Sequence, residues 1–260
     1  MSFDLLLCIV AYHPTRVEVD RLKRCLSALP SNIKYAVYVN DYRQSEPIES
    51  LAADSLLFLR NSGNIGYGSA INLLVKNLDE IPDYLGFLNT DLSWNPGTFE
   101  SILQYANSHH NVNLIVPKIL SPSGKMQMLC KQNPTVLAIF SRRFIPSYMK
   151  PTWLADYDAW YVMADYDYHS IFCVPYLSGC CMVSRASAFL SVGGFDERFF
   201  LYLEDADLTR SLAQYGLCIH FPDSSIMHDW GRGSYINFKL MIINLISAWK
   251  YFCKWGFKLW

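Results

Sequence analysis

The sequence predicts an α/β protein with a mostly parallel sheet and helices on both faces. The chain has 260 residues, 52% of them apolar, which is enough for one large domain with a full core. Its first apolar run, Leu5–Ala11, is continuous, as expected for a strand that is buried on both faces. Segments with strand and helix patterns then alternate, which favours parallel strands joined by helices.

The individual elements follow from hydrophobic periodicity and from turn residues. In the first half, we expect strands at Leu5–Ala11, Tyr35–Val39, Ser55–Leu59 and Tyr84–Leu88, and helices at Val17–Leu29, Gly68–Leu78 and Thr98–Asn107. In the second half, we expect strands at Leu114–Pro117, Cys180–Ser184 and Leu217–Phe221, and a helix at Asp205–Tyr215. Val17 should face inward from its helix, and Pro222 should end the last strand. Residues 121–175 are rich in Pro, Tyr and Trp and suit a variable acceptor-side region.

Charge and cysteine content narrow the functional class. The formal net charge is −1, so a general nucleic-acid binder is disfavoured, and an anionic substrate would need a local metal or backbone N–H groups. The eight cysteines form no CxxC pair and are expected to be reduced core residues. The first residues lack the basic region of a signal peptide, so we expect a cytoplasmic location.

Polar residues gather where the predicted strands end. Tyr12 follows the first strand, Asn40-Asp41 the second, the loop Asn61–Gly68 the third and Asn89-Thr90-Asp91 the fourth. In open α/β sheets, ligands bind beyond the carboxyl ends of the strands. Each segment alone is also compatible with ordinary turn chemistry, but all four together favour a binding site.

The loop Asn61–Gly68 contains three glycines and leads into a helix that carries Asn72. Glycines permit close backbone approach to a ligand, and the helix start offers free N–H groups. The loop is neither a Walker A loop nor a GxGxxG motif, and a plain strand-to-helix turn fits it equally well.

Carboxylates occur at two further places. Asp91, at a strand end, could hold a hard divalent cation against a diphosphate, or it could cap the next turn. Glu204, Asp205 and Asp207 begin a helix, where the helix dipole favours acids and keeps a general base ionised. Asp207 and Arg210 have the spacing of a structural ion pair.

Taken together, these blocks resemble the family-two glycosyltransferases with the GT-A fold, notably the non-processive rhamnosyltransferase-like branch. The resemblance covers about residues 5–235, and its most specific parts are GGFDERFFLYLEDADLTRSLAQYG and the downstream HDWGRGS. The motif usually written Asn-Pro-Asp is Asn89-Thr90-Asp91 here, a departure that retains the carboxylate. The Gln-x-x-Arg-Trp motif of the processive synthases is absent from the sequence, which favours transfer of a single sugar.

The resemblance implies a Rossmann-like GT-A domain at 1–235, followed by an amphipathic tail at 236–260. It implies Mg²⁺ or Mn²⁺ held by Asp91 and His228, and an inverting reaction that moves one sugar, with rhamnose as a candidate, from a nucleotide diphosphate donor to a hydroxyl of a glycan or lipid-linked acceptor. It makes Asp205 the base, with Glu204 beside it. The donor contacts it implies are Tyr12, Asp41, Asn64, Gly66, Asn72 and Asn89.

Two alternatives stay open at this stage. A nucleotidyltransferase would need a glycine-rich loop near the N-terminus, and residues 11–16 hold no glycine. A non-catalytic sugar-nucleotide binder or scaffold would not need the Asp91, Asp205 and His228 set. The tail from Phe238 to Trp260 alternates Lys with Trp, which suits either a helix on a membrane surface or one packed on its own domain.

Overall fold

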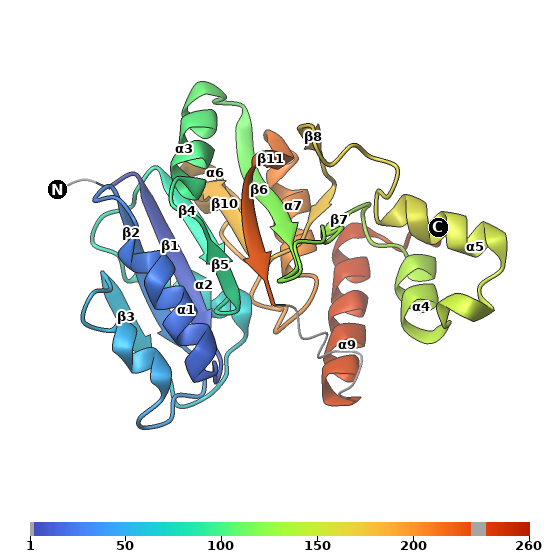
Figure 1. Cartoon of the computed structure of the whole chain (residues 1–260). Helices are drawn as coiled ribbons and strands as arrows, with labels where there is room; N and C mark the ends of the chain where they lie inside the picture. The colour runs from blue at the N-terminus through green and yellow to red at the C-terminus, as the bar shows by residue number, and fades with distance from the viewer. Residues whose placement is uncertain (1–2, 230–237) are drawn as a thin grey trace.

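The computed structural model describes residues 3–229 and 238–260 and confirms the predicted α/β class (Figure 1). The elements are β1 Leu5–Ala11, α1 Arg16–Ser27, β2 Ile33–Val39, η1 Pro47–Leu51, β3 Leu57–Arg60, α2 Tyr67–Lys76, β4 Tyr84–Leu88, β5 Leu92–Trp94, α3 Thr98–Ser108, β6 Val112–Leu120, β7 Cys130–Lys131, α4 Val136–Phe144, η2 Ser147–Met149, α5 Thr152–Tyr161, β8 Phe172–Cys173, β9 Tyr176–Leu177, β10 Cys181–Arg185, α6 Ala186–Ser191, α7 Glu204–Leu212, β11 Leu217–His228 and α9 Phe238–Trp255. The predicted domain boundary at 235/236 and the end of the HDWGRGS motif lie outside the described residues.

Within the described residues, nine strands form one sheet in the order β3-β2-β1-β4-β10-β6-β11-β5, with β8 also paired to β11. The strands β3, β2, β1 and β4 are mutually parallel, as the first half of the sequence predicts. Strand β10 runs antiparallel to both β4 and β6, and β11 is again parallel to β6. Helices α1 and α3 cover the face turned toward the viewer in Figure 1, while α2, α6 and α7 lie behind it.

This topology brings distant segments to one edge of the sheet. The carboxyl ends of β1, β2, β3, β4, β6 and β11 point the same way, and the antiparallel strands β5 and β10 begin there. Cys181 pairs with Leu88, and His228 pairs with Leu92. The segments after β4 and before β10, and the end of β11, therefore meet at this edge.

The prediction that Pro222 ends the last strand is wrong. Strand β11 continues from Leu217 to His228, and its register against β6 shifts between Phe221 and Ser225. Proline donates no ladder hydrogen bond, and a register irregularity is where a strand tolerates it. As a result, the continued strand carries His228 to the same edge of the sheet as Asp91.

The prediction that Val17 faces inward is also wrong, because this residue is 73% exposed. Thr15 caps α1 with a reciprocal capping box to Glu18, so the helix starts at Arg16. Val19, Leu22 and Leu26 then share the buried face. The cap, more than the apolar pattern, sets the rotation of this helix.

The C-terminal helix α9 packs against the domain through one face. Ser247, Ala248, Tyr251 and Phe252 are buried, and the last three form a second apolar cluster with residues of α7 and of the loop before it. The opposite face exposes Ile242, Leu245, Ile246 and Trp249. Beyond α9, the carbonyls of Lys258 and Leu259 accept hydrogen bonds from Val136 N and Leu137 N, at the start of α4.

Candidate active site

Asp91 and His228 face each other at the edge where β4 and β11 end. The distance from His228 Nε2 to Asp91 Oδ2 is 3.3 Å, and the His228 ring is buried. Asp91 Oδ1 is also buried, without a hydrogen-bond partner among the described residues. The backbone holds the pair together, because Asp229 N donates to Asp91 O at 3.1 Å. An orphaned buried carboxylate oxygen beside an imidazole nitrogen indicates a position for a cation.

Gln127 fixes the orientation of the His228 ring. Its Nε2 donates to the backbone carbonyl of His228 at 2.8 Å, which leaves Oε1 as an acceptor 3.2 Å from His228 Nδ1. Nδ1 must therefore carry the proton in this pair. In a neutral ring, Nε2 then presents its lone pair toward the Asp91 carboxylate, which is the tautomer that a metal ligand needs. Gln127 was not predicted from sequence, where no local signal marks it.

These two donors fit Mg²⁺ or Mn²⁺ only as part of a shared coordination shell. Across residues 3–229 and 238–260, no group of three or more His, Cys, Asp or Glu residues lies close enough to hold a metal by itself. A site with two protein ligands is suited to a cation that is also bound by phosphate oxygens of a substrate.

A short strained segment positions Glu204 and Asp205. Tyr202 and Leu203 both have positive φ, 69° and 64°, immediately before α7. Residues other than glycine rarely adopt this backbone conformation, and its occurrence often marks a functional site. It turns the chain so that α7 begins with Glu204 and places both carboxylates in the interior, Asp205 at 9% exposure.

The Asp205 carboxylate is held by backbone donors. Gly179 N donates to Oδ2 at 2.8 Å, and Ala206 N donates to Oδ1 at 2.9 Å. A Cβ on Gly179 would lie 3.0 Å from the Cβ of Asp205, so a larger residue there would push the loop before β10 away from Asp205 by a few tenths of an ångström. Tyr67 OH in turn donates to the carbonyl of Gly179 at 3.3 Å, which ties the site to α2.

The groups around the two acids separate their protonation. Burial and the neighbouring Asp205 raise the pKa of Glu204 well above its ordinary value. Burial also raises the pKa of Asp205, but the Lys131 ammonium and the N–H groups of Gly179 and Ala206 oppose that rise. The pair therefore carries its negative charge on Asp205, while Glu204 keeps its proton more readily.

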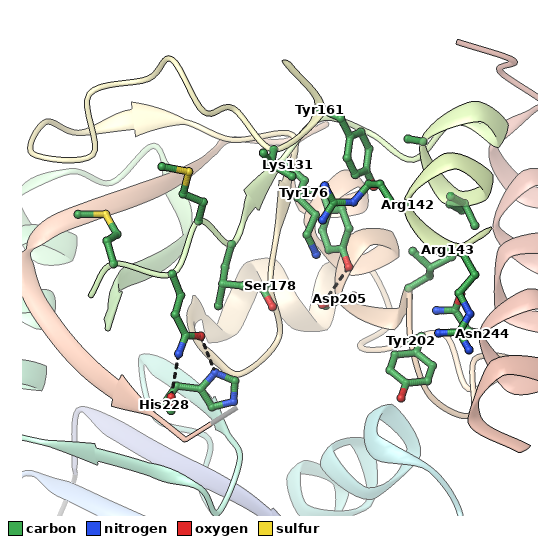
Figure 2. Close-up of a pocket in the computed structure, with 18 of the residues that line it drawn as sticks. Lys131, Arg142, Arg143, Tyr161, Tyr176, Ser178, Tyr202, Asp205, His228 and Asn244 are labelled. Atoms are coloured by element: carbon green, nitrogen blue, oxygen red, sulfur yellow. Dashed lines mark hydrogen bonds between the residues drawn. The ribbon is translucent and has the colours of Figure 1, made fainter. Parts of the chain in front are cut away.

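A cavity of about 790 Å³ joins the two parts of the site (Figure 2). It is lined by His228 and Asp205, together with Tyr176, Tyr202 and Ser178 among others. Its size is in the range of small-molecule sites. Much of its wall comes from residues 121–162, including Lys131, Arg142 and Arg143. The sequence had placed an acceptor-side region there without naming these residues.

On the donor side, the predicted contact Asp41 is engaged with neighbours. Its Oδ2 lies 2.8 Å from His13 Nε2 and 3.3 Å from Arg43, and the hydrogen bond to His13 lowers the pKa of Asp41. Tyr12 is 56% exposed, with its ring centroid 4.5 Å from that of His13. Tyr12 thus presents an accessible aromatic face beside the Asp41 carboxylate, an arrangement suited to a planar base.

Three other residues that were predicted to contact the sugar donor, Asn64, Gly66 and Asn72, contact the backbone of neighbouring segments. Asn64 Oδ1 accepts from Gly66 N at 2.9 Å, and a Cβ on Gly66 would meet the Phe200 carbonyl at 2.3 Å. Asn72 bonds the segment before α7 through Phe195 O at 2.8 Å and Phe195 N at 3.0 Å. These residues hold the glycine loop against the segment that leads to Asp205. Their direct contact with a donor stays a prediction.

Asn89 lies at the end of β4 and is partly exposed. Its backbone N–H donates to Cys180 O at 3.1 Å, which fixes the chain just before Asp91. Its predicted contact with the ribose or sugar also stays a prediction.

The predicted pairing of Asp207 with Arg210 is wrong. Asp207 is buried, lies 2.8 Å from Lys254 Nζ and accepts from Trp255 Nε1 at 2.7 Å. Arg210 donates instead to Tyr251 OH at 3.1 Å. The third acid of the Glu-Asp-Ala-Asp block is structural, as predicted, but its partners belong to α9.

Comparisons with known proteins show which proteins the chain is similar to. No family model matches the chain. An N-acetylglucosaminyl-diphospho-decaprenol L-rhamnosyltransferase of Mycobacterium tuberculosis strain H37Rv is 30% identical over 180 residues, 65% of this chain and 57% of that protein. Among solved structures, GalNAc-T7 with UDP, GalNAc and Mn²⁺ has a TM-score of 0.64 at 12% identity, covering 88% of this chain and 43% of that one. The mannosyltransferase PcManGT of Pyrobaculum calidifontis, with GDP-Man and Mn²⁺, has a TM-score of 0.61 at 12% identity, covering 98% and 64%.

The chain is similar in sequence to a rhamnosyltransferase and shares the fold of solved glycosyltransferase structures. Its GT-A fold is confirmed by the solved structures, and its closeness to rhamnosyltransferases by the sequence relative. The chain spans 57% of the length of the mycobacterial relative. Among residues 3–229 and 238–260, the structure contains no helical segment capable of crossing a lipid bilayer.

Proposed function

We propose that the chain is an inverting, metal-dependent glycosyltransferase that moves a single sugar from a nucleotide diphosphate donor to a hydroxyl of a lipid-linked cell-surface glycan. Rhamnose is the candidate sugar, because the mycobacterial relative is named as a rhamnosyltransferase. The observation that carries the proposal is the Asp91–His228 pair, which has an orphaned, buried carboxylate oxygen and whose histidine lines the same cavity as Asp205.

Asp91 and His228 would hold Mg²⁺ or Mn²⁺. Bound there, the cation would neutralise the charge that develops on the departing nucleotide diphosphate. The chain's own contribution is to orient the two ligands, since Gln127 fixes the tautomer of His228 and the Asp229 N–H fixes the backbone of Asp91. Mn²⁺ in two solved structures of the same fold supports a divalent ion.

Asp205 would act as the general base. Its carboxylate takes the proton of the acceptor hydroxyl as that oxygen attacks the anomeric carbon. A new C–O bond forms while the bond from that carbon to the diphosphate oxygen breaks, so the configuration inverts in one displacement. The backbone N–H groups of Gly179 and Ala206 hold the carboxylate in place and favour its charged form before the substrate arrives.

The donor nucleotide would lie along the edge of the parallel strands, between Tyr12, Asp41 and the loop containing Asn64 and Gly66. The acceptor would enter through the cavity walled by residues 121–162. A lipid-linked acceptor is supported by the name of the mycobacterial relative and by the apolar side chains on the outer face of α9. A position at the inner face of the cell membrane follows from this proposal.

The metal role predicts a conditional change in thermal stability. Nucleotide sugars with Mn²⁺ should raise the melting temperature of the unaltered protein, because a ligand that binds only the folded state stabilises it by mass action. With EDTA in place of Mn²⁺, the shift should largely vanish. Asp91→Ala should lose the Mn²⁺-dependent shift, while the exposed control Asp20→Ala retains it. An equal shift in Asp91→Ala would contradict the metal role, and no shift with any UDP, GDP or dTDP sugar would contradict donor binding.

The base role predicts a pH effect from Lys131. A general base works only when deprotonated, so activity falls as the pH drops through its pKa. The Lys131 ammonium opposes the rise in the pKa of Asp205, so Lys131→Met should raise that pKa and move the acid limb of the kcat/KM profile to higher pH. Lys125→Met, a change in the same cavity, is the control and should leave the limb in place. An unmoved acid limb in Lys131→Met would exclude Asp205 as the titrating base.

A further inference from the structure

Positive charge is concentrated in the cavity. The formal net charge of the whole chain is −1, yet the described cavity wall includes Lys125, Lys131, Arg142 and Arg143, against the single carboxylate of Asp205. Lys131 Nζ lies 4.4 Å from the ring centroid of Tyr176, and its charge opposes the rise in the pKa of Asp205. Positive side chains thus outnumber carboxylates in this wall, so the cavity has the charge of a site for an anion.

Arg142 is held in place by an aromatic ring. Its guanidinium lies 5.6 Å from the ring centroid of Tyr161, and among residues 3–229 and 238–260 it has no ion-pair partner. Lys150, nearby in sequence, differs because it is paired with Asp158. A guanidinium stacked on a ring keeps its planar set of N–H donors available, and that geometry matches phosphate oxygens.

The two arginines lie away from the metal ligands. In Figure 2, Arg142 and Arg143 are on the far side of Asp205 from His228. Donor phosphates bound at Asp91 and His228 would therefore not occupy the position of the arginines. An anion bound by the two arginines would therefore belong to a part of the substrates other than the donor phosphates.

Apolar surface continues outward from the arginines. Both also line a second hollow of about 360 Å³ together with Phe144 and Ile145. On the same helix, α4, the side chains of Phe140 and Phe144 are 53% and 45% exposed, with ring centroids 5.1 Å apart. Cationic donors next to exposed aromatic rings complement a molecule that joins an anionic head to a hydrocarbon chain.

We propose that Arg142 and Arg143 bind the diphosphate of a prenyl-diphosphate-linked acceptor, with its sugar directed toward Asp205 and its prenyl chain along Phe140 and Phe144. This inference rests on the proposed function, since it assigns the acceptor side of the same cavity. It differs from the donor site in needing no metal, because guanidinium groups supply the counter-charge.

The test is calorimetric titration with farnesyl diphosphate in EDTA, which removes metal-dependent binding at Asp91 and His228. The unaltered protein should bind it and bind farnesol, which lacks phosphate, far more weakly. Arg142→Gln with Arg143→Gln should weaken binding by about tenfold or more, because charge-assisted hydrogen bonds are lost. Arg24→Gln, an exposed arginine on α1, is the matched control and should bind as the parent does.

Several outcomes would overturn the proposal: no binding of farnesyl diphosphate by the parent, equal binding of farnesol, or unchanged binding in the double variant. Loss of binding in Asp91→Ala would also overturn it, because the probe would then be at the donor site. Thermal unfolding of each variant shows whether the fold is retained. Arg142→Lys keeps the positive charge and is a milder change at the same position, so it helps to distinguish loss of the site from loss of the fold. The two proposals can fail separately. If nucleotide sugars with Mn²⁺ do not raise the melting temperature, but farnesyl diphosphate binds in a way that depends on the arginines, the proposed reaction is rejected and the anion site is retained.

Discussion

Asp205→Asn should lower kcat by about 10²–10⁴-fold, the range that general base catalysis supplies. The amide has the shape of the carboxylate but cannot take a proton from the acceptor hydroxyl. Because Asp205 lies outside the proposed metal ligands, Mn²⁺-dependent donor binding should persist in this variant. Single-turnover transfer and donor calorimetry, measured on the same preparation, check the two halves of the prediction.

Glu204→Gln is the matched control for that experiment. The pKa of Glu204 is raised well above its ordinary value by burial and by Asp205, so an uncharged amide resembles the state that this side chain already favours. Its turnover should therefore fall much less than that of Asp205→Asn. If Glu204→Gln is the more damaging change, the two acids have been assigned the wrong way round.

Asp207→Ala should destabilise the fold by about 3 kcal/mol, the lower end of the cost of breaking a buried ion pair. The change leaves the indole N–H of Trp255 without its acceptor and removes one of two carboxylates from Lys254. Lys254 keeps Asp196 at 3.0 Å, which limits the loss. Urea unfolding of both proteins, with comparison of midpoints and slopes, provides the measurement.

The control for this change is Asp20→Ala, which removes the exposed ion pair between Asp20 Oδ2 and Arg16 Nε, 3.8 Å apart. Such pairs contribute about 0–1 kcal/mol, so its unfolding midpoint should barely move. Equal stability of the Asp207→Ala and Asp20→Ala proteins would mean that α9 is not anchored through Asp207.

Local patterns in the sequence were sufficient for the first half of the fold. Strand β4 has the predicted bounds, and the apolar run of β1 is buried along its whole length. Parallel topology then brings the ends of such strands to one edge, so the polar residues that follow them could be predicted as one site. The Asp91–His228 contact needed the resemblance as well, because a lone histidine carries little information.

The remaining features depend on contacts between residues far apart in the sequence. Gln127 acts on His228 across 101 positions, and Asp207 bonds Trp255 across 48 positions. The periodicity of apolar residues along the sequence cannot reveal such pairs. Arg142 and Arg143 lie in a segment whose short helices surround a cavity, so they follow no single apolar stripe, and the sequence left their role unassigned.

The C-terminal segment is fastened to the rest of the molecule at two places. Lys254 and Trp255 attach it to α7, and the carbonyls of Lys258 and Leu259 complete the first turn of α4. The first N–H groups of a helix have no partner within it, so α4 depends on this outside support. The helix α7, which carries Asp205, and the helix α4, which carries Arg142 and Arg143, are thus held by the same C-terminal segment, and we expect its release to loosen both helices together.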